Sequence, residues 1–218
     1  MAQNINEDSG SSNTKIKVLL ITDDHYGSSF VYEDESIKSI KHQFEDFGWD
    51  LILTSLSDTI MPCDWGEQAL GSKPIIISHK FLKIKEPSDF DATIILPGRS
   101  FSNLINNTDL LNFLKKANEE EMIIAAWCRV VSVLAAANII SGKNIIGHFD
   151  YFEEYKSTGA NYIEYSFKLE NGKKLFTNAT PPIKDGNIIT CIRSLYYRNE
   201  MCQLIKESID QKRSPERP

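Results

Sequence analysis

The chain has 218 residues, a length that predicts one large domain or, as the alternative, two small ones. Its composition is 41% hydrophobic and 25% charged, which is ordinary for a globular protein and excludes a collagen-like or wholly disordered chain. Thirty acidic residues against 24 basic ones give a formal net charge of -6, and this balance argues against nucleic acid or an anionic membrane as a partner.

The four cysteines, Cys63, Cys128, Cys191 and Cys202, have the spacing of neither a zinc knuckle nor a small secreted disulfide scaffold. No apolar run approaches the roughly 20 residues of a membrane helix. The first residues also lack the charged-then-apolar layout of a secretory signal. We therefore expect a cytoplasmic protein with free thiols.

The two ends of the chain are polar. Residues 1–14 contain few apolar side chains and predict a disordered N-terminal arm, and residues 210–218 predict a flexible C-terminal tail. Between them, residues 15–209 alternate short β-branched runs with amphipathic stretches and show no internal repeat. This alternation predicts one α/β domain.

In chain order, the first predicted strand is Lys17–Thr22, whose continuous apolar run is typical of a strand buried on both faces of a parallel sheet. A helix is expected over residues 34–47, because apolar residues recur there at helical spacing until Gly48. Further strands are predicted at residues 49–55, 75–78, 92–96, 122–127, 144–148, 161–167, 174–178 and 187–191. Further helices are predicted after Asn107 or Thr108 and at residues 129–137, 153–158 and 197–209. The pattern predicts a mainly parallel sheet with helices on both faces.

In open α/β sheets, ligands bind beyond the carboxyl ends of the strands. Four segments that follow apolar runs should therefore meet at one edge of the sheet: residues 22–25, residues 97–100, residues 128–129 and His148. Cys128 is the candidate nucleophile, because a tight turn in A-A-W-C-R-V-V would present its side chain at this edge. The following helix N-terminus and Arg129 would lower the thiol pKa. The alternative is that Cys128 is a buried small apolar residue, as free cysteines usually are.

Four segments occur in this order along the chain: I-I-L-P-G-R-S, I-I-A-A-W-C-R, S-G-K-N-I-I-G-H and D-G-N-I-I-T. Together they resemble the PfpI/ThiJ superfamily, the family of the Parkinson-disease-associated protein, which has the class I glutamine amidotransferase-like fold. The resemblance covers residues 15–208. It implies that fold, a single-domain flavodoxin-like sandwich, and a homodimer.

By position, the resemblance makes Cys128 the nucleophile on an elbow and places His148 near it. The family's Pro-Gly-Gly turn, whose amides face the reacting oxygen, matches Pro97, Gly98 and Arg99. The second glycine of that turn is thus replaced by arginine, or one residue is deleted.

The family's acidic partner of the cysteine comes from the start of the first helix, here within Y-E-D-E-S. Counting back from Gly48 without a gap gives Ser36. A one-residue shift gives Glu35, which we take as the candidate, with Glu33 and Ser36 left open.

Other positions depart from the family's pattern. Proteases and glyoxalases of the family often have His and then Gly after the cysteine, whereas this chain has Arg129 and Val130. Ser102 falls where some oligomeric members lend an acidic residue to a neighbouring subunit. These departures argue against protease activity.

The first functional hypothesis is a glyoxalase- or deglycase-like enzyme in which the Cys128 thiolate adds to a small carbonyl compound. Amides near Gly98 and Arg99, with Arg129, would hold the oxyanion, and His148 or Glu35 would move the proton. The second hypothesis is a catalytically degenerate dimer that binds a partner or senses oxidants through the same cysteine. The third is an amidase or amidotransferase-like hydrolase.

A metal or nucleotide site has weaker support. His25 follows Asp23 and Asp24, but a polar loop of caps and Asx turns is the preferred interpretation. No GxGxxG or GxxxxGK[ST] string is present, which disfavours a nucleotide site. We predict neither a metal nor a cofactor.

Overall fold

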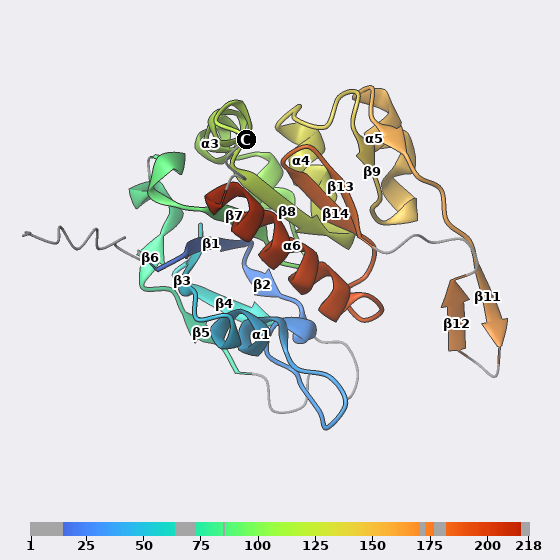
Figure 1. Ribbon diagram of the computed structural model, residues 1–218, viewed down its shortest axis with the longest axis horizontal. Helices are drawn as coiled ribbons and strands as arrows, with labels where there is room; N and C mark the ends of the chain where they lie inside the picture. Colours follow the sequence, from blue (N-terminus) through green and yellow to red (C-terminus); the bar gives the residue numbers. More distant parts are fainter. Residues whose placement is uncertain (1–14, 64–72, 85, 171–172, 177–181, 215–218) are drawn as a thin grey trace, which may run out of the picture.

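The computed structural model describes residues 15–63, 73–84, 86–170, 173–176 and 182–214. The strands of the main sheet are β1 (Lys17–Thr22), β3 (Asp50–Ser55), β6 (His79–Lys80), β7 (Ala92–Ile95), β8 (Ile123–Trp127), β13 (Ile183–Asp185) and β14 (Ile188–Cys191). They form a seven-stranded sheet in the order β13-β14-β8-β7-β1-β3-β6 (Figure 1). Neighbouring strands are parallel except for β13, which runs antiparallel to β14.

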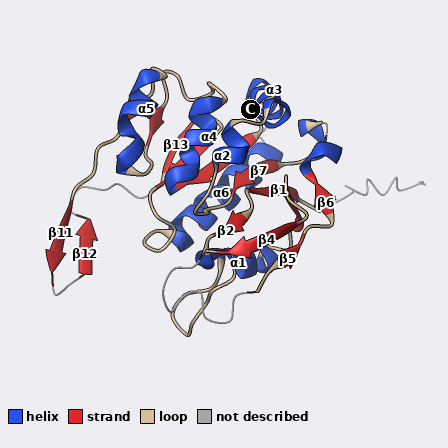
Figure 2. Ribbon diagram, turned by 180° about the vertical axis from the view of Figure 1, so that it is seen from behind, coloured by secondary structure: helices blue, strands red, loops and turns tan. Residues whose placement is uncertain are grey.

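Helices cover both faces of this sheet. They are α1 (Ile40–Asp46), α2 (Ser102–Ile105), α3 (Thr108–Glu119), α4 (Val131–Ala136), α5 (Phe152–Ser157) and α6 (Arg198–Arg213). Apolar side chains of α1 and α6 belong to one buried cluster, and those of α3, α4 and α5 belong to another. Figure 1 is viewed from the side of α6, and Figure 2, from behind, shows α2 and α4 over the opposite face.

Smaller pairings complete the fold. Strand β2 (His25–Tyr26) pairs in parallel with β4 (Thr59–Pro62), which pairs antiparallel with β5 (Ile75–Ile76). Strands β9 (Asn144–Ile145) and β10 (Asn161–Tyr162) form a parallel pair. The antiparallel hairpin of β11 (Phe167–Glu170) and β12 (Lys173–Phe176) extends away from the body in Figures 1 and 2. Within the described ranges, no helix is both long and apolar enough to cross a membrane.

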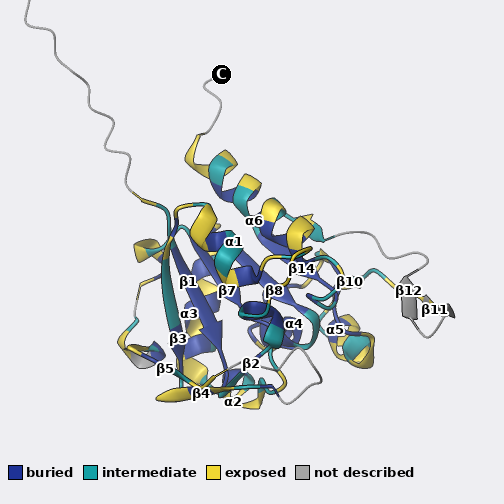
Figure 3. Cartoon of the chain, turned by 90° about the horizontal axis from the view of Figure 1, so that it is seen from below, coloured by how far each residue is buried: buried dark blue, intermediate teal, exposed yellow. Residues whose placement is uncertain are grey.

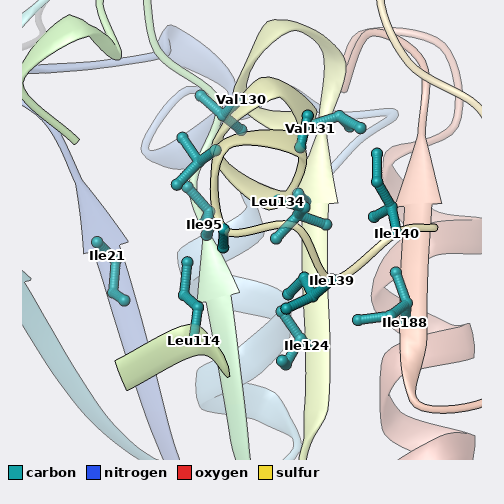
Figure 4. Close-up of a cluster of buried hydrophobic side chains, with 14 of the residues drawn as sticks. Ile21, Ile95, Leu114, Ile124, Val130, Val131, Leu134, Ile139, Ile140 and Ile188 are labelled. Carbon is teal, nitrogen blue, oxygen red and sulfur yellow. The ribbon is translucent and has the colours of Figure 1, made fainter. Parts of the chain in front are cut away.

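The central strands are apolar throughout because alternate side chains enter the two opposite clusters. In β1, Leu19 and Ile21 belong to the cluster under α3 and α4, whereas Val18 and Leu20 belong to the cluster under α1 and α6. Figure 4 shows Ile21 in the first cluster, and Figure 3 shows the central strands buried along their length. The predicted parallel sheet with helices on both faces is confirmed.

The first helix is much shorter than predicted. It begins at Ile40, because Ser39 is its N-cap and the Ser39 Oγ accepts a hydrogen bond from the His42 amide at 3.1 Å. Upstream, Asp34 Oδ1 accepts hydrogen bonds from the amides of Ser36 and Ile37 and holds this segment as a turn. Residues 34–39 are therefore a loop.

Other predicted boundaries also need correction. The last helix continues to Arg213, so the first residues of the predicted 210–218 tail are helical. The strand predicted at 144–148 ends at Ile145, and the strand predicted at 161–167 contains only β10 and the first residue of β11. Strand β12 covers residues 173–176 of the strand predicted at 174–178, and residues 177–178 lie outside the described ranges, as does the predicted 1–14 arm.

Candidate functional site

Cys128 has a strained backbone. It lies between β8 and α4, and its φ is +55°, in the left-handed region. Two other described non-glycine residues, Glu121 and Asn138, have positive φ, and each directly follows a helix C-cap, where this conformation is common. Cys128 instead begins a helical turn, so its strain has no such ordinary cause. A strained residue at a strand-to-helix junction is the geometry of the predicted nucleophile elbow.

A cavity of about 100 Å³ lies in front of this turn. It is lined by residues 27–29 after β2, Cys63 after β4, Pro97 and Gly98 after β7, Cys128 after β8, and residues 193–195 after β14. Of the four segments expected to meet, only Pro97, Gly98 and Cys128 line this cavity. Residues 22–25 and His148 are not among its described lining residues. The cavity is smaller than the roughly 300–1,000 Å³ of pockets for drug-sized ligands, so it suits a small molecule.

Two glycines allow the loops around the cavity to approach closely. The Gly27 amide donates a hydrogen bond to the Pro97 carbonyl at 2.6 Å, and a Cβ on Gly27 would lie 2.7 Å from that oxygen. A Cβ on Gly98 would lie 2.6 Å from the His25 carbonyl oxygen. Any larger residue at either position would push the two loops apart.

Arg99, the next residue of the predicted oxyanion turn, has a different role. Its amide donates a hydrogen bond to the Cys63 thiol at 3.1 Å, and Arg99 is not among the residues that line the cavity. The amide expected to face a reacting oxygen is therefore engaged by a sulfur. Cys63 is buried at the cavity wall.

Burial determines the ionisation of Cys128. The pKa of its thiol lies above the ordinary value, because burial disfavours the charged thiolate. A hydrogen bond from the Arg129 backbone and the positive charges of Arg193 and Arg129 oppose this effect without overcoming it. The predicted lowering of the thiol pKa is thus wrong, and a base must remove the proton when the sulfur reacts.

His148 is linked to Cys128 through the backbone. Its amide donates a hydrogen bond to the Cys128 carbonyl at 3.3 Å, and the residue is only 8% exposed. The preceding Gly147 packs closely on Tyr155, since a Cβ there would lie 2.9 Å from the Tyr155 ring. The imidazole stacks on Phe149 with ring centroids 4.7 Å apart, and it is not among the residues that line the cavity.

Asp150 is a site residue that the sequence did not reveal. Its Oδ2 lies 3.4 Å from His148 Nδ1 and 4.0 Å from the Arg129 guanidinium. Its amide also donates a hydrogen bond to His148 Nδ1 at 3.3 Å. Asp150 therefore holds the imidazole and adds a negative charge that raises the Cys128 pKa. The only sequence signal was its position two residues after the predicted histidine.

The predicted acidic partner of Cys128 lies elsewhere. Glu35 is exposed, and Glu33 accepts hydrogen bonds from His42 Nδ1 at 2.9 Å and from the Ser39 amide at 3.3 Å. The His42 bond holds the pKa of Glu33 below its ordinary value. Ser36 is hydrogen-bonded to Asp34. None of the three candidates is among the described residues that line the cavity.

A buried arginine explains why these three candidates lie away from the cavity. Arg198, in α6, is 2% exposed, and its guanidinium donates hydrogen bonds to the carbonyls of Tyr32 at 2.9 Å and Lys38 at 3.0 Å. The loop that contains the glutamates is thereby held against α6. Residues 27–29, and not the loop with the glutamates, line the cavity. Ser29 Oγ is hydrogen-bonded to Ser194 Oγ at 2.6 Å.

The loop after β1 is a hydrogen-bonded turn, as its sequence indicated. Asp23 Oδ1 accepts hydrogen bonds from the Asp24 amide at 2.8 Å and from Asn103 Nδ2 at 2.7 Å, and His25 Nδ1 lies 2.9 Å from Asp24 Oδ1. In the described part of the chain, no three His, Cys, Asp or Glu residues form a group that could hold a metal.

The comparison with protein families agrees with this geometry. The sequence model of the DJ-1/PfpI family matches residues 33–205. The chain belongs to the DJ-1/PfpI family. This confirms the resemblance that the four sequence segments indicated.

One curated relative of this chain is a Bacillus subtilis (strain 168) protein named "Uncharacterized protease YdeA". It is 30% identical over 138 residues, which cover 58% of this chain and 68% of the relative.

Two solved structures with DJ-1/PfpI-type domains show the same fold. A ThiJ/PfpI domain protein from Brachyspira murdochii has a TM-score of 0.65 at 16% identity, over 92% of this chain and 98% of the other. A two-domain Anabaena variabilis protein, with DJ-1/ThiJ/PfpI-like and ferritin-like domains, has a TM-score of 0.67 at 16% identity. That match covers 91% of this chain but only 48% of the Anabaena protein. The predicted flavodoxin-like fold is confirmed.

Proposed function

We propose that this protein is a cysteine-dependent enzyme that acts on small carbonyl compounds, with Cys128 as the nucleophile. The observation that carries the proposal is the positive φ of Cys128 at the wall of a small cavity, where helix-end geometry does not explain the strain. The size of the cavity supports a small substrate in preference to a peptide.

The proposed reaction begins with addition to an aldehyde. The Cys128 sulfur bonds to the carbonyl carbon, the C=O π pair moves to oxygen, and the thiol proton passes through His148 to that oxygen. The product is a hemithioacetal. In this proposal the Gly98 amide, at the cavity wall, stabilises the oxyanion, and the Asp150 carboxylate, whose Oδ2 lies 3.4 Å from His148 Nδ1, stabilises the protonated imidazole.

A 2-oxoaldehyde such as methylglyoxal can then complete a turnover. The proton on the former aldehyde carbon moves to the neighbouring carbon, and the hydroxyl proton moves to the neighbouring oxygen, which gives a 2-hydroxyacyl thioester. Water hydrolyses the thioester to a 2-hydroxy acid and restores the thiol. The net change is the addition of one water molecule, so no redox partner is needed.

The test is methylglyoxal consumption with lactate as the measured product. We expect turnover by the wild type and a loss of about a thousandfold or more in Cys128→Ala. Cys202→Ala is the matched control, because Cys202 is buried in α6 and does not line the cavity. Absence of turnover in the wild type, or equal activity in Cys128→Ala, would contradict the proposal.

One observation favours a second candidate, a non-catalytic binding or redox-sensing protein. The described residues that line the cavity include no carboxylate, and the Arg99 amide is engaged by Cys63. This candidate predicts no turnover of methylglyoxal but a stoichiometric mass increase at Cys128 after peroxide treatment.

The proposal includes a homodimer, as commonly found for members of this family, and a cytoplasmic location. Light scattering should then give about twice the 24.8 kDa mass of the chain.

A further inference from the structure

Two buried hydroxyl groups meet at the wall of the cavity. Ser29 lies in the segment after β2, and Ser194 is the third residue after β14. The two residues are 3% and 6% exposed, and their Oγ atoms lie 2.6 Å apart. Both line the cavity together with Cys128. Segments that are 165 residues apart in the chain thus place a pair of hydroxyls beside the thiol.

The hydroxyl pair has one more proton to donate than its own contact uses. A serine hydroxyl donates one hydrogen bond and accepts up to two. Whichever of Ser29 and Ser194 donates to the other, the accepting hydroxyl keeps its own proton. Within the described part of the chain, neither hydroxyl has a further hydrogen-bond partner. Because a buried donor gains stability from an acceptor, the second proton is available to a molecule that enters the cavity.

This pair and the Gly98 amide reach the cavity from different strands. In the main sheet, β8 lies between β7 and β14. Gly98 follows β7 and Ser194 follows β14, so they come from strands on opposite sides of the one that leads to Cys128. A molecule bonded to the sulfur can therefore meet two separate hydrogen-bond donors.

We propose that the Ser29–Ser194 pair determines substrate specificity by donating a hydrogen bond to a second, uncharged oxygen, on the carbon next to the one attacked by Cys128. The inference rests on the proposed function, since it assigns specificity residues to the same site. A site built to bond a substrate oxygen discriminates against an analogue that lacks it, because the buried donor is then left unpaired. The cavity of about 100 Å³ requires both oxygens to belong to one short molecule, as they do in a 2-oxoaldehyde.

Two three-carbon aldehydes test this role at Cys128. Methylglyoxal has an oxygen on the carbon next to its aldehyde group, whereas propanal has two hydrogens there. Both react alike: the sulfur bonds to the aldehyde carbon and the thiol proton moves to the aldehyde oxygen, which protects the thiol from iodoacetamide. Iodoacetamide forms a sulfur-to-carbon bond and releases iodide, and peptide mass spectrometry measures its rate at Cys128. The concentration of each aldehyde that halves this rate is determined in brief reactions with the aldehyde in large excess.

The double variant Ser29→Ala with Ser194→Ala is compared with the wild type, because it leaves neither hydroxyl buried without its partner. Its half-protecting concentration of methylglyoxal should rise about threefold to tenfold, as expected for one lost hydrogen bond, and that of propanal should stay unchanged. The ratio of the two concentrations cancels any change in the Cys128 pKa, because both aldehydes react with the same thiol.

Ser208→Ala is the matched control. Ser208 is also buried, at 2% exposed, but its hydroxyl donates a hydrogen bond to the Leu204 carbonyl at 2.7 Å within α6. It is not among the described residues that line the cavity. Its substitution should leave the ratio of the two half-protecting concentrations unchanged.

A measurement on the wild type alone does not depend on the folding of any variant. N-acetylcysteine, a free thiol, gives the intrinsic preference of a thiol for methylglyoxal over propanal. Folded Cys128 should show a preference at least about threefold stronger than this reference.

The outcomes separate the two proposals. A preference at Cys128 equal to that of N-acetylcysteine, or a ratio unchanged in the double variant, overturns the role of the hydroxyl pair and leaves Cys128 chemistry standing. Failure of both aldehydes to protect Cys128 in the wild type overturns the proposed function and the inference with it.

Discussion

At the scale of single residues, Cys128 shows that position and ionisation are separate properties. The turn with φ of +55° presents the side chain at the cavity, while burial keeps the thiol protonated. The position could be predicted from the strand-to-helix junction in the sequence. The pKa could not, because it depends on how deeply distant loops bury the sulfur.

The raised pKa predicts the pH profile of Cys128 alkylation. The thiolate is the reactive form, so the rate with iodoacetamide should rise with pH to a midpoint above that of a free cysteine, about 8.5. Arg193→Gln should move the midpoint higher still, because the Arg193 charge favours the thiolate. A wild-type midpoint below that of the unfolded protein would show that burial does not dominate at Cys128.

At the scale of elements, the long parallel strands were predictable and the loops between them were not. Strands β1 and β8 are apolar because both of their faces are covered, and this leaves a continuous pattern in the sequence. The start of α1 depends on Ser39 and on hydrogen bonds from Arg198, which is remote in the chain. Because such contacts join residues that are far apart in the chain, the sequence placed Glu35 beside Cys128 and did not reveal that Arg193 lines the cavity.

The loop after β7 is held by a buried carboxylate. Asp23 is 2% exposed, and it accepts hydrogen bonds from Asn103 Nδ2 at 2.7 Å and from the Asn103 amide at 3.1 Å. Asp23→Asn replaces an acceptor with a donor that faces these groups. We expect the free energy of unfolding in urea to fall by about 1–3 kcal/mol.

The neighbouring Asp24→Asn is the matched control for this change, because Asp24 is partly exposed. It should shift the free energy of unfolding by less than about 0.5 kcal/mol. Equal effects of the two substitutions would show that the buried hydrogen bonds do not hold the loop.

At the scale of the whole molecule, buried thiol and phenol groups make the free energy of unfolding decrease at alkaline pH. Burial raises the pKa values of the Cys128, Cys191 and Cys202 thiols and raises that of Tyr165 to about 12. These groups stay protonated in the folded state but ionise in the unfolded chain, from about pH 8.5 for thiols and about pH 10 for Tyr. Their contribution to the free energy of unfolding is therefore complete below about pH 8.5 and is lost as the pH rises.

This dependence can be measured by urea unfolding between about pH 7.5 and 10.5. The free energy of unfolding should decrease with pH, and Cys202→Ala should make the decrease shallower, because one buried thiol is removed. An identical slope in the variant would show that Cys202 ionises equally in both states.

The alignment of β14 with β8 has a consequence for how this site can change. Successive residues of a strand point to opposite faces, so a slip of one position would exchange the two faces of β14. The same slip would bring Ile192 or Ser194 to the place of Arg193 and leave the cavity without its cation. A one-residue insertion or deletion that shifted this alignment would therefore change the side chain at the cavity wall while the strands of the sheet are retained.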